Sequence, residues 1–260
     1  MKIGIVYDRR KPAAKKLAFK VRDWLKKKEH QVFLRLSNSI LENFDFAITF
    51  GGDGLILHTA NKVAAYEVPL LRVNFGYVGF LSNIEPAEIF EKLSVMLDEN
   101  NYIITKRTRM EILVKDEKGN LLARKDALND IVVERIDTRA IVCEIAVDGE
   151  CNEYRGDGII FATRTGSTAY VESAGGPTLI KEDKLILRVI SPSDREQLPY
   201  FIRPDNAVFE ISRISSKARL AVDGVKIMNL SGNEQIIVQR SSQETFFIEI
   251  GDVGKIKEEP

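Results

Sequence analysis

The sequence predicts an N-terminal α/β domain with a parallel sheet, followed by an all-β C-terminal domain. In the first hundred residues, short apolar runs alternate with amphipathic segments, and this alternation is typical of a parallel sheet covered by helices on both faces. Beyond residue 102 short β-rich runs dominate, separated by turn signals such as Asp148-Gly149 and Asp223-Gly224. A chain of 260 residues is long enough for two modest domains. We therefore expect domains at 1–101 and 102–245.

The elements of the first domain follow from the periodicity of its apolar residues. Between 12 and 29 these residues recur at the spacing of one helix face, from Ala14 and Leu17 to Trp24 and Leu25. Pro86 is typical of a first helical turn. The expected strands are 2–7, 31–36, 45–50 and 70–73, and the expected helices are 12–29, 55–65 and 86–97.

The second domain is predicted to be a sandwich or a folded sheet. A short helical stretch between glycines, within 166–176, interrupts its strands. The expected strands are 102–107, 110–115, 130–135, 140–147, 158–162, 185–190, 207–213, 218–222, 235–239 and 245–250.

Composition and charge exclude several classes of function. Lys plus Arg and Asp plus Glu both number 38, so no global basic field attracts nucleic acid or an acidic membrane. No apolar run approaches the length of a membrane span. The N-terminal charges follow a short apolar strand, which is the wrong order for a secretory signal. We expect a cytoplasmic protein that binds neither nucleic acid nor membranes.

The only two cysteines flank the expected hairpin turn at Asp148-Gly149. A two-residue turn places Cys151 opposite Ala146 and Cys143 opposite Tyr154. The two thiols then lie on opposite faces of the hairpin, and we expect no disulfide.

The only histidines are His30 and His58, so no metal-ligand cluster is visible. His30 lies at a charged helix end, where we expect it to be solvated. His58 lies four residues beyond Gly54 on a helix and could line a site, although a structural role is favoured.

The segment Gly51-Gly52-Asp53-Gly54 links a buried strand to a helix. Open α/β sheets bind ligands at this edge, glycines allow close approach of the backbone to phosphate, and a helix N-terminus favours anions. A carboxylate here would repel phosphate unless it takes a proton from the attacking group or holds a metal. The combination indicates phosphoryl transfer. The alternative is a glycine-rich turn in which Asp53 is a helix N-cap.

A second polar constellation lies at 156–177, where the expected strand 159–162 enters a loop rich in hydroxyl groups. Ser167 is also a plausible N-cap for a short helix, and Tyr170 can stack on a base. The alternative is a Ser/Thr-rich connector. The hydroxyls that can donate to phosphate or ribose oxygens belong to Thr163, Thr165, Ser167 and Thr168.

Four motifs, in this order along the chain, resemble those of NAD kinases. They are GGDG at 51–54, NFGYVGFL at 74–81, Asn129-Asp130, and the run from Asp157 through TGSTAY to SAGGP at 173–177. GGDG alone is shared with phosphofructokinases and with diacylglycerol-type lipid kinases. The TGSTAY…SAGGP run is much more specific to NAD kinases.

The resemblance implies that NAD binds in a cleft between the two domains and that the tail, about 246–260, returns to the first domain. It makes Asp53 the general base for the 2′-hydroxyl of the adenosine ribose. It assigns Asn129 and Asp130 to the adenosine side of NAD, and Asp157 with 168–173 to the base and nicotinamide ends. The binding residues implied are Gly51, Gly52, Gly54, Asn74, Gly76, Phe80, Asn129, Asp130, Arg155, Asp157, Thr165, Gly166, Ser167, Thr168, Ala169, Tyr170 and Ser173.

Three positions depart from the usual family pattern. Arg164 replaces a proline, Leu55 replaces a frequent threonine, and Asp130 replaces the commoner glutamate. Arg164 adds a cation that either contacts a phosphate or faces solvent. Leu55 removes one hydroxyl, and Asp130 shortens the reach of the carboxylate by one methylene.

The expected activity is NAD kinase, with ATP or polyphosphate as donor and Mg²⁺ accompanying the donor, because the sequence offers no dedicated metal ligands. No GxxxxGK[ST] motif and no HRD or DFG set occurs. One alternative is a diacylglycerol- or sphingosine-type lipid kinase, for which we find no basic amphipathic helix. The other is a non-catalytic NAD(P) sensor. The choice between NAD and NADH stays open, and a homodimer or homotetramer is implied only by the resemblance.

Overall fold

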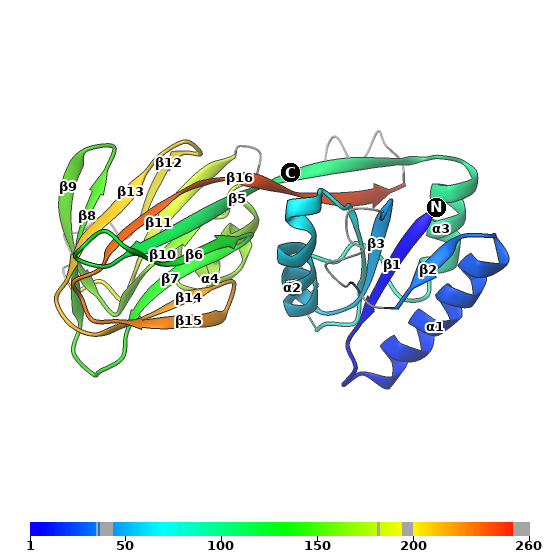
Figure 1. The fold of residues 1–260 in the computed structure, drawn as a ribbon, viewed down its shortest axis with the longest axis horizontal. Coiled ribbons are helices and arrows are strands. Elements are labelled where there is room, and N and C mark those ends of the chain that lie inside the picture. The colour runs from blue at the N-terminus through cyan, green and yellow to red at the C-terminus, as the bar shows by residue number, and fades with distance from the viewer. Residues whose placement is uncertain (35, 37–43, 78, 181–182, 194–199, 252–260) are drawn as a thin grey trace. The chain divides into compact units, whose positions relative to one another are not determined.

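The computed structural model describes residues 1–34, 36, 44–77, 79–180, 183–193 and 200–251. The chain forms two compact units: one contains residues 1–107 and the segment that begins at Glu244, and the other contains Thr108–Gln243 (Figure 1). Residue 35 of the expected second strand, and 252–260 of the tail, lie outside the described residues.

The first unit contains the predicted parallel sheet. Its strands lie in the order β2-β1-β3-β4 and are all parallel, and every residue of β3 is buried. The C-terminal strand β16 adds to this sheet in parallel with β4, at Phe247 opposite Leu70. The strands are β1 (Lys2–Tyr7), β2 (Gln31–Phe33), β3 (Phe46–Gly51), β4 (Leu70–Asn74) and β16 (Gln235–Ile250).

Helices cover both faces of this sheet. α1 (Pro12–Lys27) and α3 (Ile89–Asp98) lie on one face, where the rings of Trp24 and Phe90 meet, and α2 (Asp53–Val63) lies on the other (Figure 1). A 3₁₀ turn, Ala64–Tyr66, follows α2. None of the helices in the described part of the chain combines the length and apolar character that crossing a bilayer demands.

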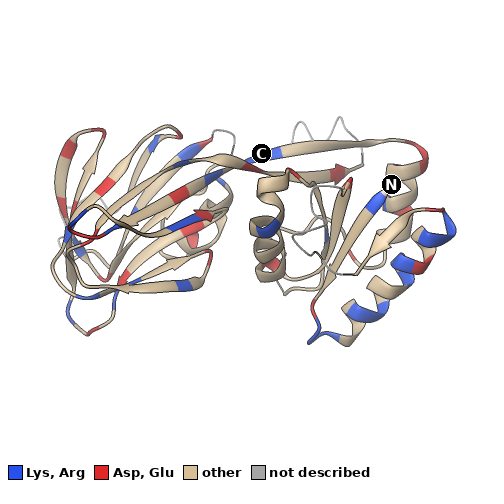
Figure 2. Ribbon diagram, in the orientation of Figure 1, with Lys and Arg blue, Asp and Glu red and all other residues tan. Residues whose placement is uncertain are grey.

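The sequence analysis overlooked that α1 is a basic amphipathic helix. Its outer face carries lysines along its length (Figure 2), while Ala14, Ala18, Val21 and Leu25 are fully buried in the core. Because the apolar face already packs against the sheet, it is not available to a lipid surface.

The second unit is a β-sandwich. One antiparallel sheet has the order β12-β11-β10-β7-β14-β15, and β13, β8, β9, β5, β6 and part of β16 belong to the other. Side chains from both sheets form one core, in which the rings of Phe161 and Phe209 lie 5.2 Å apart. The strands are β5 (Tyr102–Lys115), β6 (Leu121–Ala127), β7 (Asp130–Arg135), β8 (Ile141–Val147), β9 (Glu150–Gly156), β10 (Gly158–Ala162), β11 (Lys184–Ile190), β12 (Tyr200–Pro204), β13 (Phe209–Ile214), β14 (Ala218–Val222) and β15 (Val225–Leu230).

Several predicted strand boundaries were wrong. β5 and β16 are single strands of 14 and 16 residues, each expected as two. Polar residues interrupt the apolar alternation in the middle of both strands, yet the backbone continues through them. β6, β9, β12 and β15 were not predicted, because mostly exposed positions leave little hydrophobic periodicity to detect.

The predicted hairpin turn at Asp148-Gly149 is confirmed. Both residues of Asp148-Gly149 have positive φ, at 50° and 89°, as a type I′ turn requires. Cys143 pairs with Tyr154 and Ala146 with Cys151, in the predicted register, and both thiols are free.

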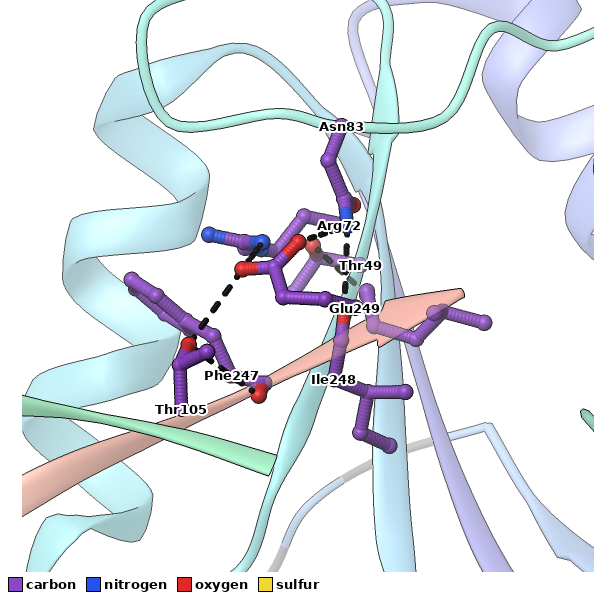
Figure 3. Close-up of polar contacts among 8 residues, drawn as sticks. Thr49, Arg72, Asn83, Thr105, Phe247, Ile248 and Glu249 are labelled. Carbon is purple, nitrogen blue, oxygen red and sulfur yellow. Dashed lines mark hydrogen bonds and ion pairs between the residues drawn. The ribbon is translucent and has the colours of Figure 1, made fainter. Parts of the chain in front are cut away.

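A polar cluster around the buried Arg72 side chain fastens the end of β16 to the first unit (Figure 3). An Arg72 nitrogen lies 2.6 Å from Glu249, and the guanidinium stacks 3.9 Å from the centroid of the Phe247 ring. The Asn83 amide donates to the Ile248 carbonyl at 3.0 Å and also to Glu249. The Thr105 hydroxyl donates to Glu249 at 3.3 Å. The last strand is therefore held by charge and hydrogen bonds as well as by sheet pairing.

Candidate active site

Asp53 is the first residue of α2, and Gly52 occupies the N-cap position. The alternative interpretation of Asp53 as the N-cap is therefore wrong. Its carboxylate instead accepts the backbone N–H groups of Leu81 at 3.1 Å and of Phe80 at 3.3 Å. Its position in the first turn of a helix also favours the negative charge. The carboxylate is thus held at the carboxyl edge of the parallel sheet.

The glycines of this turn allow two backbone segments to touch. A Cβ on Gly52 would lie 3.1 Å from the Cα of Gly76. The Phe75 N–H donates to the Gly51 carbonyl at 2.9 Å, and the Gly76 N–H donates to the Asn74 side chain at 2.8 Å. By contrast, a Cβ on Gly54 would meet no atom within 4 Å. Gly54 therefore faces open space beside Asp53.

Two aromatic rings lie exposed on the loop that binds Asp53. The Tyr77 side chain is fully exposed and Phe80 is 58% exposed. The Lys11 ammonium donates to the Phe75 carbonyl and lies 5.7 Å from the centroid of the Tyr77 ring. Exposed rings beside a fixed carboxylate offer surfaces on which a base or a ribose can rest.

In the second unit, Asp223 organises the Asn129-Asp130 motif. Its carboxylate accepts the backbone N–H groups of Leu128, Asn129 and Asp130 at 2.9, 2.8 and 3.2 Å. Its own N–H donates to the Asp130 carbonyl at 2.9 Å. The sequence analysis used Asp223 only as a turn residue. Its position in a tight hairpin turn was the only feature of Asp223 that the sequence showed. That feature does not reveal that its carboxylate binds a motif more than ninety residues away.

The side chains of this motif are buried and polar. Asp130 is 6% exposed, and burial, followed by the nearby Asp223 charge, raises its pKa to about 7. The Asn129 Oδ1 atom is buried and has no hydrogen-bond partner among the described residues. Arg109 is also buried here. Burial lowers its pKa, while Asp223 and Asp126 act in the opposite direction. An orphaned buried acceptor indicates a place for a ligand hydroxyl.

The hydroxyl-rich loop packs directly onto this motif. A Cβ on Gly166 would lie 2.0 Å from the Asn129 carbonyl oxygen, so only glycine fits. The Thr163 N–H donates to the same carbonyl at 3.0 Å, and the Thr163 hydroxyl donates to the Leu128 carbonyl at 2.6 Å. Two motifs far apart in sequence therefore form one structure.

Several loop hydroxyls bond to the protein itself. Ser167 is fully buried; its hydroxyl donates to the Arg164 carbonyl at 2.7 Å and accepts the Leu179 N–H at 2.9 Å. Its prediction as an N-cap is wrong, since Ala169 precedes the short helix α4 (Tyr170–Ser173) and the 3₁₀ turn Thr165–Thr168 comes before it. The hydroxyls of Thr168 and Ser173 also bond to nearby carbonyls, both at 3.3 Å.

Tyr170 is 39% exposed beside several acids. Its pKa is raised by burial and then by the charges of Glu134, Asp130 and Asp157. Asp157 is paired with Arg135 at 2.9 Å, a residue that the sequence did not single out. Arg155 is exposed on β9.

The first unit presents a carboxylate among glycines, and the second presents a buried Asn-Asp motif. Together these features are typical of a class of kinases. Two family models match, the ATP-NAD kinase N-terminal domain over residues 27–102 and the ATP-NAD kinase C-terminal domain over 97–250. The chain belongs to the ATP-NAD kinase family.

Relatives and solved structures agree with this membership. The chain is 35% identical to an NAD kinase of Thermococcus sibiricus, over 97% of this chain and 95% of that protein. It is 33% identical to an NAD kinase of Pyrococcus abyssi, with shares of 95% and 94%. An NAD kinase from Archaeoglobus fulgidus, solved with ATP, superposes with a TM-score of 0.78 at 26% identity, covering 99% of this chain and 96% of that one. A yeast NADH kinase solved with NADH has the same fold, with a TM-score of 0.87 at 23% identity, covering 99% and 85%.

Proposed function

We propose that this protein is an NAD kinase, which transfers the terminal phosphoryl group of ATP or a related donor to the 2′-hydroxyl of the adenosine ribose of NAD. Family membership supports phosphoryl transfer to NAD. The main structural support for this chemistry is the position of the Asp53 carboxylate. The backbone amides of Leu81 and Phe80 hold it beside the open face of Gly54.

In the proposed reaction Asp53 takes the proton of the 2′-hydroxyl as that oxygen attacks the terminal phosphorus. A bond forms between the ribose oxygen and phosphorus. The bond from phosphorus to the bridging oxygen breaks, and ADP leaves with that electron pair. Two hydrogen bonds from the backbone leave acceptor capacity on the carboxylate, since its two oxygens offer about four lone-pair sites. Holding the base in advance removes part of the entropic cost of reaction.

We assign the Asn129-Asp130 motif to the ribose of the adenosine. The orphaned Asn129 Oδ1 can accept a hydroxyl proton. Asp130, with its pKa near 7, can accept from a hydroxyl when ionised or donate to one when protonated. We assign the exposed ring of Tyr170 to stacking on a base.

The metal is assigned to the donor rather than to a protein cage. Within the described residues, no three His, Cys, Asp or Glu side chains gather closely enough to hold a metal ion. This fits Mg²⁺ bound through phosphate oxygens and water, an arrangement that Mg²⁺ favours because it dehydrates reluctantly. When bound in this way, the ion neutralises charge on the donor phosphates.

The two alternatives kept from the sequence, a lipid kinase and a non-catalytic sensor, gain no support from the comparisons. Use of polyphosphate, a homodimer or homotetramer, and a cytoplasmic location stay predictions.

A direct assay tests the proposed function. The protein would be supplied with labelled ATP and Mg²⁺, and with NAD, NADH, diacylglycerol or buffer alone. An NADP-specific dehydrogenase would detect the product. We expect label in NADP, and no label when NAD lacks the 2′-hydroxyl. Label in diacylglycerol, or none with either dinucleotide, would contradict the proposal.

A further inference from the structure

The loop that follows β4 is fixed again directly after it has bound Asp53. The N–H groups of Phe80 and Leu81 donate to the Asp53 carboxylate at 3.3 and 3.1 Å. Two residues further on, the Asn83 N–H donates to the Arg72 carbonyl at 3.2 Å. The chain therefore returns to β4 immediately beyond the two amides that hold the carboxylate.

The Asn83 side chain continues this connection to the last strand (Figure 3). Its amide donates to the Ile248 carbonyl at 3.0 Å and also to the Glu249 carboxylate. β16 pairs with β4 at Phe247, so Asn83 meets the strand just beyond this pairing. One side-chain amide thus ties the loop that holds Asp53 to the end of the C-terminal strand.

Glu249 is a well-fixed acceptor for this amide. Its carboxylate lies 2.6 Å from an Arg72 nitrogen and accepts the Thr105 hydroxyl at 3.3 Å. Arg72 is itself buried, and its guanidinium lies 3.9 Å from the centroid of the Phe247 ring. Hydrogen bonds to a charged group are shorter and stronger than those between neutral groups. The contact with Glu249 is therefore the stronger of the two that the Asn83 amide makes.

The stretch between Leu81 and Asn83 is too short to absorb a movement at Asn83. Only Ser82 separates them, and two residues span at most about 7 Å. On the other side of Leu81, Gly79 has a left-handed φ of 75°, and a Cβ there would lie 2.9 Å from the Ser82 hydroxyl oxygen. Because this segment has no slack, a displacement of Asn83 also displaces the two amides that hold the carboxylate.

We infer that Asn83 is a positioning residue for the phosphoryl transfer: by anchoring its loop to Ile248 and Glu249, it keeps the amides that hold Asp53 in place. The inference rests on the proposed function, since Asp53 is the base of that reaction. Among the described residues, Asn83 makes no hydrogen bond to Asp53 and acts through the loop alone. A displacement of about 1 Å in a catalytic group can cost on the order of 10²-fold in rate, so loss of the anchor slows the chemical step.

The test compares variants of the full-length protein. Asn83→Ala removes the amide, and Asn83→Asp keeps its size but replaces the donor with a carboxylate that faces Glu249. Asn83 lies at the surface, so both changes leave the core intact. The matched control is Asn101→Ala. Asn101 is exposed just before β5 in the same unit, and among the described residues its side chain makes no hydrogen bond.

Two measurements separate a positioning role from a purely structural one. The first is the rate of hydrogen exchange of the Phe80 and Leu81 amides, measured by NMR, which requires no enzymatic activity. The second is a double-mutant cycle on kcat, with Asn83→Ala made both in the wild type and in Asp53→Asn, and with KM for NAD and for ATP measured in each protein. If Asn83 acts through Asp53, its removal has no further effect once that carboxylate is gone.

We expect exchange of the Phe80 and Leu81 amides to become about threefold faster or more in both Asn83 variants. In the wild-type background, Asn83→Ala lowers kcat about tenfold, while KM for ATP stays within about twofold. In the Asp53→Asn background, the same change leaves kcat as it was. The Asn101→Ala protein behaves as the wild type in every measurement.

Three results would each overturn the inference: unchanged exchange of the two amides, an equal fall of kcat in the Asp53→Asn background, or the same effects in Asn101→Ala. Failure of the proposed function is distinguished from failure of this inference by the exchange measurement. If the wild type never phosphorylates NAD, the proposed function fails by itself, and the exchange rates alone decide whether Asn83 holds the amides against Asp53.

Discussion

The Asp53 carboxylate accepts the backbone N–H of Leu81 at 3.1 Å, across 28 residues of sequence. The loop that follows β4 thus closes over the turn that follows β3, and the Phe80 N–H adds a second contact. The same loop supplies Gly76, which lies against Gly52. The position of the proposed base therefore depends on two motifs that neighbour each other only because their strands are adjacent and parallel.

Replacing Gly52 or Gly54 of the GGDG turn by alanine should change the stability of the protein in opposite directions. Gly52→Ala places a Cβ 3.1 Å from the Gly76 Cα, and we expect a loss of about 1–3 kcal/mol of stability. Gly54→Ala meets open space within α2 and should raise stability by up to about 1 kcal/mol, since alanine is the better helix former. Its turnover should nevertheless fall, because the added methyl occupies the open face beside Asp53. Urea titration and steady-state rates measure both effects. Equal stability of the two variants would contradict this account of the turn.

Stability should depend on the ionisation of Asp130. Its pKa of about 7 in the folded protein lies above the ordinary value of 3.8, so between these values the folded state binds more protons than the unfolded state. The free energy of unfolding therefore falls as pH rises from about 4 to about 7, on the order of 1 kcal/mol per pH unit from this group. Asp130→Asn resembles the neutral acid and removes this component. The measurement is the difference in unfolding free energy between wild type and variant at several pH values. A difference that stays constant from pH 4 to 7.5 would show that the group titrates normally.

The buried pair of Arg72 and Glu249 gives a prediction for stability. Glu249→Leu leaves the Arg72 guanidinium, 4% exposed as a residue, without its carboxylate, and we expect a loss of about 3–5 kcal/mol. The double variant Arg72→Met/Glu249→Leu should lose much less, because no charge is then buried alone. The fluorescence of Trp24, the only tryptophan, reports on unfolding of this unit. If the double variant is no more stable than Glu249→Leu, the unpaired charge of Arg72 is not the cause of the lost stability.

Arg164, the departure from the family pattern, is predicted to be replaceable by proline. Its backbone angles, φ −52° and ψ −45°, suit proline, and among the described residues no hydrogen bond uses its N–H and no partner meets its guanidinium. Arg164→Pro should be neutral or raise stability by about 0.4–1 kcal/mol, through the unfolded state. KM for NAD and for donor should stay unchanged. A severalfold rise in either KM would instead place the guanidinium on a phosphate.

The sequence predicted the parts of this protein that local patterns determine. The parallel sheet followed from apolar runs and helix periodicity, and the register of Cys143 and Cys151 followed from the Asp148-Gly149 turn. The breaks expected within β5 and β16 were wrong, because local polarity at positions such as Arg109 does not show that a side chain is buried.

Contacts between residues far apart in the sequence could not be predicted, because local patterns do not show them. Asp223 lies more than ninety residues from the motif that it holds, and Glu249 lies 177 residues from Arg72. Periodicity and motif spacing contain no information on such contacts, which arise only when the strands are brought together.

The most direct test of the central claim is the turnover of Asp53→Asn with NAD and ATP, measured together with its affinity for NAD. We predict that turnover falls about 10²–10⁴-fold, which is the loss that typically follows removal of a general base. The affinity for NAD, measured by calorimetry, should stay close to that of the wild type. Asp98→Asn, which removes an exposed carboxylate at the end of α3 in the same unit, should keep full turnover. An Asp53→Asn protein that turns over within about threefold of wild type would contradict the assignment of Asp53 as the base.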